Sequence, residues 1–120
     1  MKKTIGKNKV DTNKAAQNKT DLMKVCFTVT GLVQRLPSTE FIKPDMEVTL
    51  EKEPDNEWDK EAIRVLLPGL GHIGYVANSV RTVMGDSYSA GRLYDKIGET
   101  AKAKVLYNLN TAVICEIEIA

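Results

Sequence analysis

The stretch that decides the fold reads EPDNEWDKEAIRV, from Glu53 to Val65. Pro54 fixes its own φ and biases the residue before it toward extended backbone. Asp55 and Asn56 readily hydrogen-bond their own backbone and tolerate left-handed conformations, so the chain is predicted to turn sharply here. The apolar run Ala62–Leu67 then predicts a strand that leaves the turn.

The only tryptophan, Trp58, falls inside this otherwise charged loop. A large apolar ring in such a position either plugs the core of the domain or offers an exposed face for stacking. Asn56 and Asp59 are also open to two interpretations, because both are ordinary turn formers as well as hydrogen-bonding groups. The exposure of the Trp58 ring would distinguish the two interpretations.

Alternation of apolar and polar residues predicts further strands on both sides of this loop. With the run that follows the loop there are six predicted strands, the other five being Val25–Thr30, Met46–Leu50, His72–Val76, Ala101–Tyr107 and Val113–Ile119. Asn108 and Asn110 suit a tight hairpin turn between the last two strands.

Two short helices are predicted between the fourth and fifth strands. Apolar residues recur at helical spacing in Asn78–Gly85 and again in Ala90–Ile97. The long connection Leu32–Pro44 is expected to pack Phe41 and Ile42 against the core. Six strands with two small helices predict a compact barrel.

Charge divides the chain into two parts. Residues 1–20 carry six lysines and one aspartate, a local net charge of +5, and almost no large apolar residue. We therefore predict a disordered basic tail over residues 1–21 and one folded domain over residues 22–120. The remainder of the chain holds eleven Lys and Arg against fifteen Asp and Glu, a net charge of −4. Such an acidic body is poorly suited to sequence-independent phosphate binding, to which the tail adds either a weak attraction or only solubility.

The location of the protein is predicted from what the sequence does not contain. No apolar run reaches membrane-spanning length, and the tail lacks the apolar segment of a secretory signal. An intracellular, cytoplasmic location without membrane contact is therefore expected. Cys26 and Cys115 lie in strand patterns without C-x-x-C spacing, so we predict reduced core thiols and no zinc site.

The remaining motifs do not form a catalytic set. Gly69–Gly74 matches G-x-G-x-x-G, but the chain continues as a strand where a dinucleotide site needs a helix. These glycines are expected to shape a hairpin turn, with Gly74 allowing a close backbone approach. The alternating acidic residues of Glu51–Glu61 lack the spacing of a calcium loop. His72 is the sole histidine, and no serine-nucleophile or phosphate-loop motif occurs, so the sequence predicts no enzyme activity, no cofactor and no metal.

Three linked elements carry a family resemblance. They are an apolar-x-apolar strand at Val48–Leu50, the pattern E-P-x-N-x-aromatic-D-x-x-A-I-x-V at Glu53–Val65, and G-Y-V at Gly74–Val76. In this order they resemble the HIRAN domain family over about Val25–Glu118. With the strand pattern, the resemblance predicts a mainly β fold, a six-stranded barrel of OB-like or SH3-like shape with two short helices. It also implies nucleic-acid binding, which in the best understood members is capture of the 3′ end of single-stranded DNA.

The resemblance also places the expected site. Asn56, Trp58 and Asp59 correspond to terminal-nucleotide contacts in the family, and Tyr75 stands where a further contacting side chain lies. A carboxylate at Asp59 is a natural acceptor for a 3′ hydroxyl, and Trp58 offers a face on which a base can stack. The full set of expected nucleic-acid-binding residues is Asn56, Trp58, Asp59, Tyr75, Asn78, Arg81 and Arg35.

The chain departs from the family pattern after its first strand. There the DNA-binding members carry an Arg-aromatic-aromatic run whose rings sandwich the last base, whereas Gly31 is followed here by Leu32-Val33-Gln34-Arg35. Only Arg35 is comparable. The sequence thus favours a module for single-stranded DNA, with 3′ ends as its target, in DNA repair or processing. The alternative is a protein-interaction module that docks onto a DNA-processing assembly, without direct DNA binding, through an exposed strand edge or the Tyr88–Ile97 segment.

Overall fold

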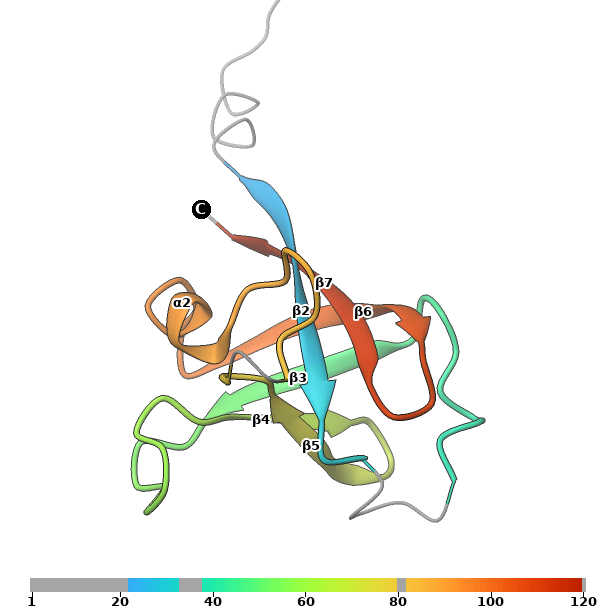
Figure 1. Ribbon diagram of the computed structural model, residues 1–120, viewed down its shortest axis with the longest axis horizontal. Coiled ribbons are helices and arrows are strands. Elements are labelled where there is room, and N and C mark those ends of the chain that lie inside the picture. Colours follow the sequence, from blue (N-terminus) through green and yellow to red (C-terminus); the bar gives the residue numbers. More distant parts are fainter. Residues whose placement is uncertain (1–21, 33–37, 80–81, 120) are drawn as a thin grey trace, which may run out of the picture.

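Strands on both sides of the quoted loop pair into one closed barrel. The computed structural model describes residues 22–32, 38–79 and 82–119, so the predicted tail, Arg35 and Arg81 lie outside the described residues. Within them, six antiparallel strands follow the order β2-β5-β4-β3-β6-β7 around the barrel (Figure 1). Their bounds are Met23–Thr30 (β2), Glu47–Lys52 (β3), Ile63–Leu67 (β4), Gly71–Val76 (β5), Thr100–Asn108 (β6) and Val113–Ile119 (β7). The predicted mainly β, six-stranded barrel is confirmed.

The barrel interior is filled by aliphatic side chains that cluster around Phe27. Ile63, Val65 and Leu67 of β4 all point inward, as the period-two pattern predicts. Full burial of each such side chain stabilises the fold by about 1.5–3 kcal/mol. Cys115 lies in the same cluster, where burial raises the pKa of its thiol to about 12. Both cysteines are free, but only Cys115 is the predicted core thiol, because Cys26 is half-buried and lies outside the core cluster.

The glycines between β4 and β5 have structural roles. Gly69 and Gly71 have φ values of +87° and +98°, a region that favours glycine. A Cβ atom at Gly74 would lie 2.4 Å from the backbone oxygen of Thr30, so glycine is what lets β5 approach β2. The G-x-G-x-x-G stretch is therefore a hairpin turn followed by a close strand contact, as predicted.

The prediction of a first helix over Asn78–Gly85 is wrong, because the described residues of this segment form turns and bends. The backbone amides of Thr82 and Val83 both donate to the backbone oxygen of Ser79 at 2.9 Å. The amide of Met84 then donates to Thr28 Oγ1 of β2 at 3.2 Å, which draws the chain away from a helical path. The second helix is present as α2 (Ala90–Tyr94), although it ends at Tyr94 rather than at Ile97.

Two apolar side chains lie where the pattern does not place them. Alternation puts Tyr107 on the same face as Val105, yet Tyr107 is 62% exposed. The register of β6 against β7 shifts between these two residues, and this bulge turns Tyr107 outward. Of the two residues expected to pack on the core from the β2–β3 connection, Ile42 is buried, whereas Phe41 is 43% exposed.

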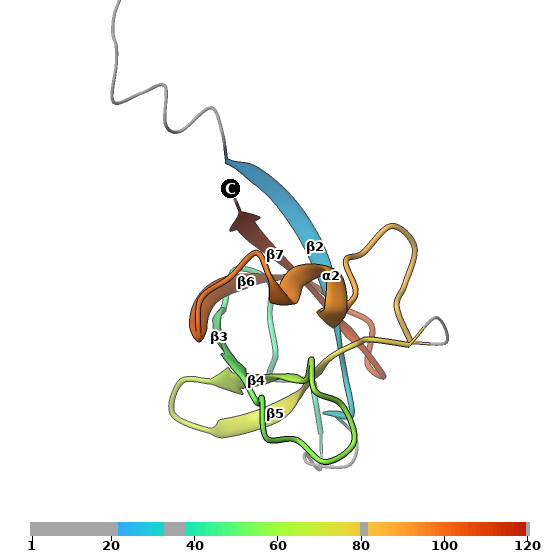
Figure 2. The same cartoon turned by 90° about the vertical axis from the view of Figure 1, so that its left-hand side faces the viewer.

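The β3–β4 loop and α2 lie on the same side of the barrel, and the chain leaving β5 runs between them (Figure 2). The amide of Ala90 donates to the backbone oxygen of Ala77 at 2.9 Å. The amide of Gly91 donates to Asn78 Oδ1 at 2.8 Å. These bonds fix α2 to the end of β5, beside the loop.

Candidate nucleic-acid interface

The β3–β4 loop, residues 53–62, is organised around the side chain of Asn56. Its Oδ1 accepts hydrogen bonds from the backbone amides of Trp58, at 2.8 Å, and Asp59, at 2.9 Å. Its Nδ2 donates to Glu53 Oε1 at 2.9 Å. Where the loop joins the strands, the amide of Glu53 donates to the backbone oxygen of Ala62 at 2.9 Å. The predicted sharp turn is therefore present, and short-range side-chain hydrogen bonds define it.

Trp58 is a surface residue, 89% exposed to solvent. Asn56 holds its backbone amide, while the indole ring stands outside the buried core. A core plug is thereby excluded. Of the two interpretations that the sequence left open, the exposed stacking face is the one that fits the structure.

Asp59 connects the loop to the end of β5. Its Oδ1 accepts from the backbone amide of Glu61 at 2.9 Å, and its Oδ2 accepts from Asn78 Nδ2 at 2.9 Å. A carboxylate offers about four lone-pair sites, so both oxygens keep acceptor capacity for a ligand. Asp59 is thus fixed in place beside the exposed indole, and its carboxylate can still accept further hydrogen bonds.

Glu53 holds Tyr75 against the same loop. The Tyr75 hydroxyl donates at 2.9 Å to Glu53 Oε1, the oxygen that also accepts from Asn56. The pKa of the Glu53 carboxyl is held below its ordinary value, first by the hydrogen bond from Asn56. The hydrogen bond from Tyr75 and the nearby positive charge of Arg64 lower this pKa further. Arg64 Nη1 lies 3.8 Å from Glu53 Oε2. Glu53 opens the quoted motif, but only the fold reveals it as the residue that positions Asn56 and Tyr75.

Side chains from the loop, β5 and the segment after β5 line one open groove of about 410 Å³. We call it the Trp58 groove. The predicted site residues in its walls are Asn56, Trp58, Asp59, Tyr75 and Asn78. The structure thus brings together the predicted site residues that it describes, while Arg81 and Arg35 lie outside the described residues. The other lining residues are Thr30, Ala62, Val76, Ala77, Ser79 and Thr82.

Asp59 is the one charged side chain among the described residues that line the Trp58 groove. Hydroxyl groups of Thr30, Ser79 and Thr82 supply further polar groups. These three residues could not be predicted from the sequence as groove residues, because an isolated hydroxyl carries no pattern of its own. Thr30 pairs with Tyr75 in the β2–β5 register, so strand pairing was the signal that would have placed it.

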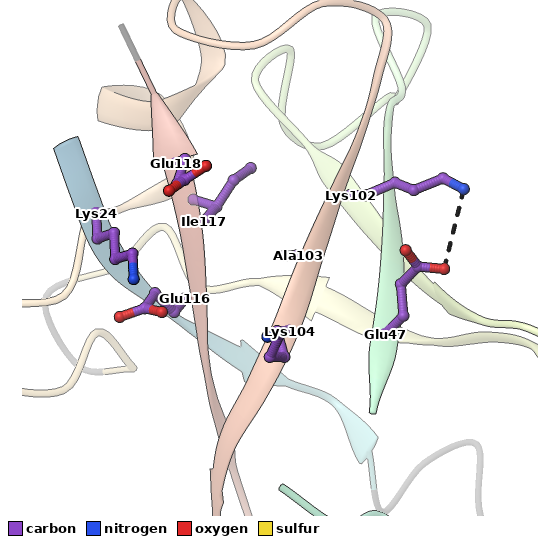
Figure 3. A pocket seen from close by; sticks show the side chains of 8 residues that line it. All are labelled: Lys24, Glu47, Lys102, Ala103, Lys104, Glu116, Ile117 and Glu118. Carbon is purple, nitrogen blue, oxygen red and sulfur yellow. Dashed lines mark ion pairs between the residues drawn. The ribbon is translucent and has the colours of Figure 1, made fainter. Parts of the chain in front are cut away.

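A different hollow, of about 430 Å³, lies on the outer face of β2, β7, β6 and β3. Figure 3 shows its side chains, with the ion pair between Lys102 Nζ and Glu47 Oε1 at 3.9 Å. Its charged lining residues comprise three lysines and three glutamates, at Lys24, Lys102, Lys104, Glu47, Glu116 and Glu118. Because these charges balance, this face has no net attraction for phosphate.

Closure of the barrel also affects the predicted docking alternative. Each strand of the described chain pairs with two neighbours, although β2 pairs with β5 only at Val29 and Thr30, so docking through a strand edge stays a prediction. Docking through the Tyr88–Ile97 segment stays a prediction. In the described ranges no helix is long and apolar enough to span a bilayer, and no group of three or more His, Cys, Asp or Glu side chains is placed to hold a metal ion.

The fold and the groove define a class of protein, a small closed β-barrel that presents an exposed aromatic face beside hydrogen-bonding groups. The family model for the HIRAN domain matches residues 23–117. This chain belongs to the HIRAN domain family. No curated protein and no solved structure matches it. HIRAN domains are nucleic-acid-binding modules, which makes the Trp58 groove the candidate interface.

Proposed function

We propose that this HIRAN domain binds single-stranded DNA and holds a free 3′ end in the Trp58 groove, as a step in DNA repair or processing. The observation that carries the proposal is the 89% exposure of Trp58 directly beside Asp59. An exposed indole stacks on any base, which is worth about 1–3 kcal/mol in single-strand binders. The role is binding alone, since the sequence supplies no catalytic set.

Asp59 gives the groove its preference for ends. A free 3′ end carries a hydroxyl, which donates a hydrogen bond to a carboxylate. A terminal phosphate in the same place would bring like charges together in a partly enclosed site. Asn78 holds Asp59 Oδ2 at 2.9 Å, so the carboxylate is oriented before the strand arrives. One fixed aspartate therefore selects free ends over phosphorylated ends.

Stacking in this domain is proposed to be one-sided. The DNA-binding relatives sandwich the last base with rings that follow their first strand, whereas Leu32 follows that strand here and is buried in the core. A buried aliphatic side chain cannot cover the outer face of a base. The terminal base is therefore held by Trp58 on one face, and the hydroxyls and amides of the groove contact its sugar and edges.

The test is fluorescence anisotropy with matched oligonucleotides that end in a 3′ hydroxyl or a 3′ phosphate. Wild type is expected to bind the free end more tightly. Asp59→Asn should abolish that preference with little change in affinity for the free end, because the amide still accepts a hydrogen bond but no longer repels phosphate.

Asp55→Asn is the matched control, since Asp55 belongs to the same loop but does not line the groove. It should keep the preference for the free end. Equal binding of both ends by wild type would rule out end recognition, and loss of the preference in Asp55→Asn would show that only the overall charge of the loop matters.

A further inference from the structure

A second hollow, of about 440 Å³, adjoins the Trp58 groove, with which it shares Asn78 and Ser79. We call it the Arg92 hollow. Its remaining lining residues are Val83, Gly85, Ser87, Ser89 and Arg92. It therefore combines hydroxyl groups with a guanidinium, and its described lining contains no carboxylate. That composition is opposite in charge to the Trp58 groove beside it.

The guanidinium of Arg92 is held in position by an aromatic side chain. Its central carbon lies 3.8 Å from the centre of the Tyr88 ring, a cation–π contact. Tyr88 in turn packs against the core, and its amide donates to the backbone oxygen of Cys26 at 2.7 Å. Within the described residues Arg92 forms no ion pair with a carboxylate. Its charge is thus pre-oriented and not neutralised by an acidic partner.

Two hydrogen bonds of Asn78 connect Asp59 to the helix that carries Arg92. Asn78 donates to Asp59 Oδ2 at 2.9 Å, and its own Oδ1 accepts from the amide of Gly91 at 2.8 Å. Asn78 therefore bridges the β3–β4 loop and α2, the element that carries Arg92. The acidic and basic groups of the two cavities are consequently held in one fixed arrangement.

We propose that the Arg92 hollow binds the last phosphodiester of the single strand whose terminal nucleotide occupies the Trp58 groove. This inference rests on the proposed function. A free 3′-terminal nucleotide carries its phosphate on the 5′ side of its sugar, away from the hydroxyl that faces Asp59. The described lining of the groove supplies no cation for that phosphate, and the adjoining hollow supplies Arg92 with the hydroxyls of Ser87 and Ser89. Asp59 and Arg92 together then fix the direction of the strand.

The experiment combines a protein variant with a change in the DNA. Wild type, Arg92→Gln and Arg92→Lys are titrated with an oligonucleotide that has a free 3′ end, and with versions that carry one neutral methylphosphonate at the last linkage or several linkages away. For wild type, the neutral last linkage should weaken binding about tenfold to a hundredfold, which is the range of a hydrogen bond to a charged group. Arg92→Gln should bind natural DNA more weakly than wild type by the same factor. Its affinity should not fall further when the last linkage is neutral, because the contact to that phosphate is already absent.

Two further measurements separate a specific contact from general charge. Arg92→Gln should lower the slope of log affinity against log salt by about 0.7, the value for one phosphate of a single strand. Lys96→Gln is the matched control, because Lys96 is an exposed cation close to α2 that lines neither cavity. It should bind almost as wild type does, and Arg92→Lys should retain part of the affinity. Urea unfolding of each variant confirms that the barrel is intact.

The outcomes distinguish this inference from the function on which it rests. If wild type prefers the free 3′ end but Arg92→Gln binds as tightly as wild type, the phosphate site is wrong and end recognition stands. Additive losses from Arg92→Gln and the neutral last linkage would also overturn the phosphate site. If wild type shows no end preference and every neutral linkage costs the same, both proposals fail.

Discussion

Phe27 and Trp58 mark two regions of this domain that are stabilised by different means. Phe27 lies in β2 at 0% exposure, inside a barrel held by strand pairing and apolar packing. Trp58 lies in the β3–β4 loop, where backbone hydrogen bonds to Asn56 fix the chain and leave the ring in solvent. The loop needs no core of its own, so its largest apolar side chain is available for binding.

Substitution in the core should give the largest effect. Phe27→Ala is expected to lower the free energy of unfolding by about 3–5 kcal/mol, because it removes buried apolar surface and leaves a cavity. Trp58→Ala should leave the free energy of unfolding almost unchanged, because the exposed indole ring makes little contact with the rest of the protein. Urea denaturation measured by far-UV circular dichroism compares the two variants, and Phe27→Leu provides a milder change if Phe27→Ala does not fold. A loss of stability in Trp58→Ala as large as that in Phe27→Ala would break the comparison.

Binding should reverse the ranking of the two regions. Trp58→Ala is expected to cost about 1–3 kcal/mol of affinity for single-stranded DNA, the range for one base stacked on an aromatic ring. Tyr107→Ala is the matched control, because Tyr107 is another exposed aromatic residue, 62% exposed on β6, and does not line the Trp58 groove. Anisotropy titration of both variants checks the difference. Equal losses would mean that exposed aromatic surface binds DNA without a defined site.

The barrel was predictable from sequence because its signal is local. Period-two alternation in runs such as Ile63–Leu67 reports directly which side chains face the core. The prediction of a helix at Asn78–Gly85 was wrong because of a contact between residues far apart in sequence. Thr28 Oγ1 of β2 accepts a hydrogen bond from the amide of Met84, and this bond keeps the segment in turns. Apolar spacing over so few residues is too weak to oppose such a contact.

The candidate site was predictable in its loop and not in its surroundings. The motif named Asn56, Trp58 and Asp59 together, but it did not reveal whether the indole faces the core or the solvent. The bond from Asn78 to Asp59 and the bond from Gly91 to Asn78 join residues that are far apart in sequence. For the same reason Arg92 carries no sequence signal, because its relation to the groove exists only after α2 packs beside β5.

Acid should give the smallest effect, and it should act on the loop before the barrel. The pKa of Glu53 is held below its ordinary value of 4.5, first by the hydrogen bond from Asn56, so the unfolded chain binds more protons between the two values. The stabilisation from this carboxylate is therefore fully present above the ordinary value and is lost as the pH falls through the folded-state value. Protonation weakens the hydrogen bonds that Glu53 Oε1 accepts from Asn56 and Tyr75.

Tryptophan fluorescence followed from neutral pH into acid reports on the loop, because Trp58 is the only tryptophan. Far-UV circular dichroism over the same range reports on the barrel. The fluorescence should change while the dichroism still shows intact strands, since no strand pairing depends on Glu53. Glu53→Gln keeps an acceptor oxygen but cannot titrate, so its fluorescence should lack this step. Coincident transitions by both probes, or a step that persists in Glu53→Gln, would mean that the loop and the barrel respond to acid as one unit and that the hydrogen bonds around Asn56 are not what separates them.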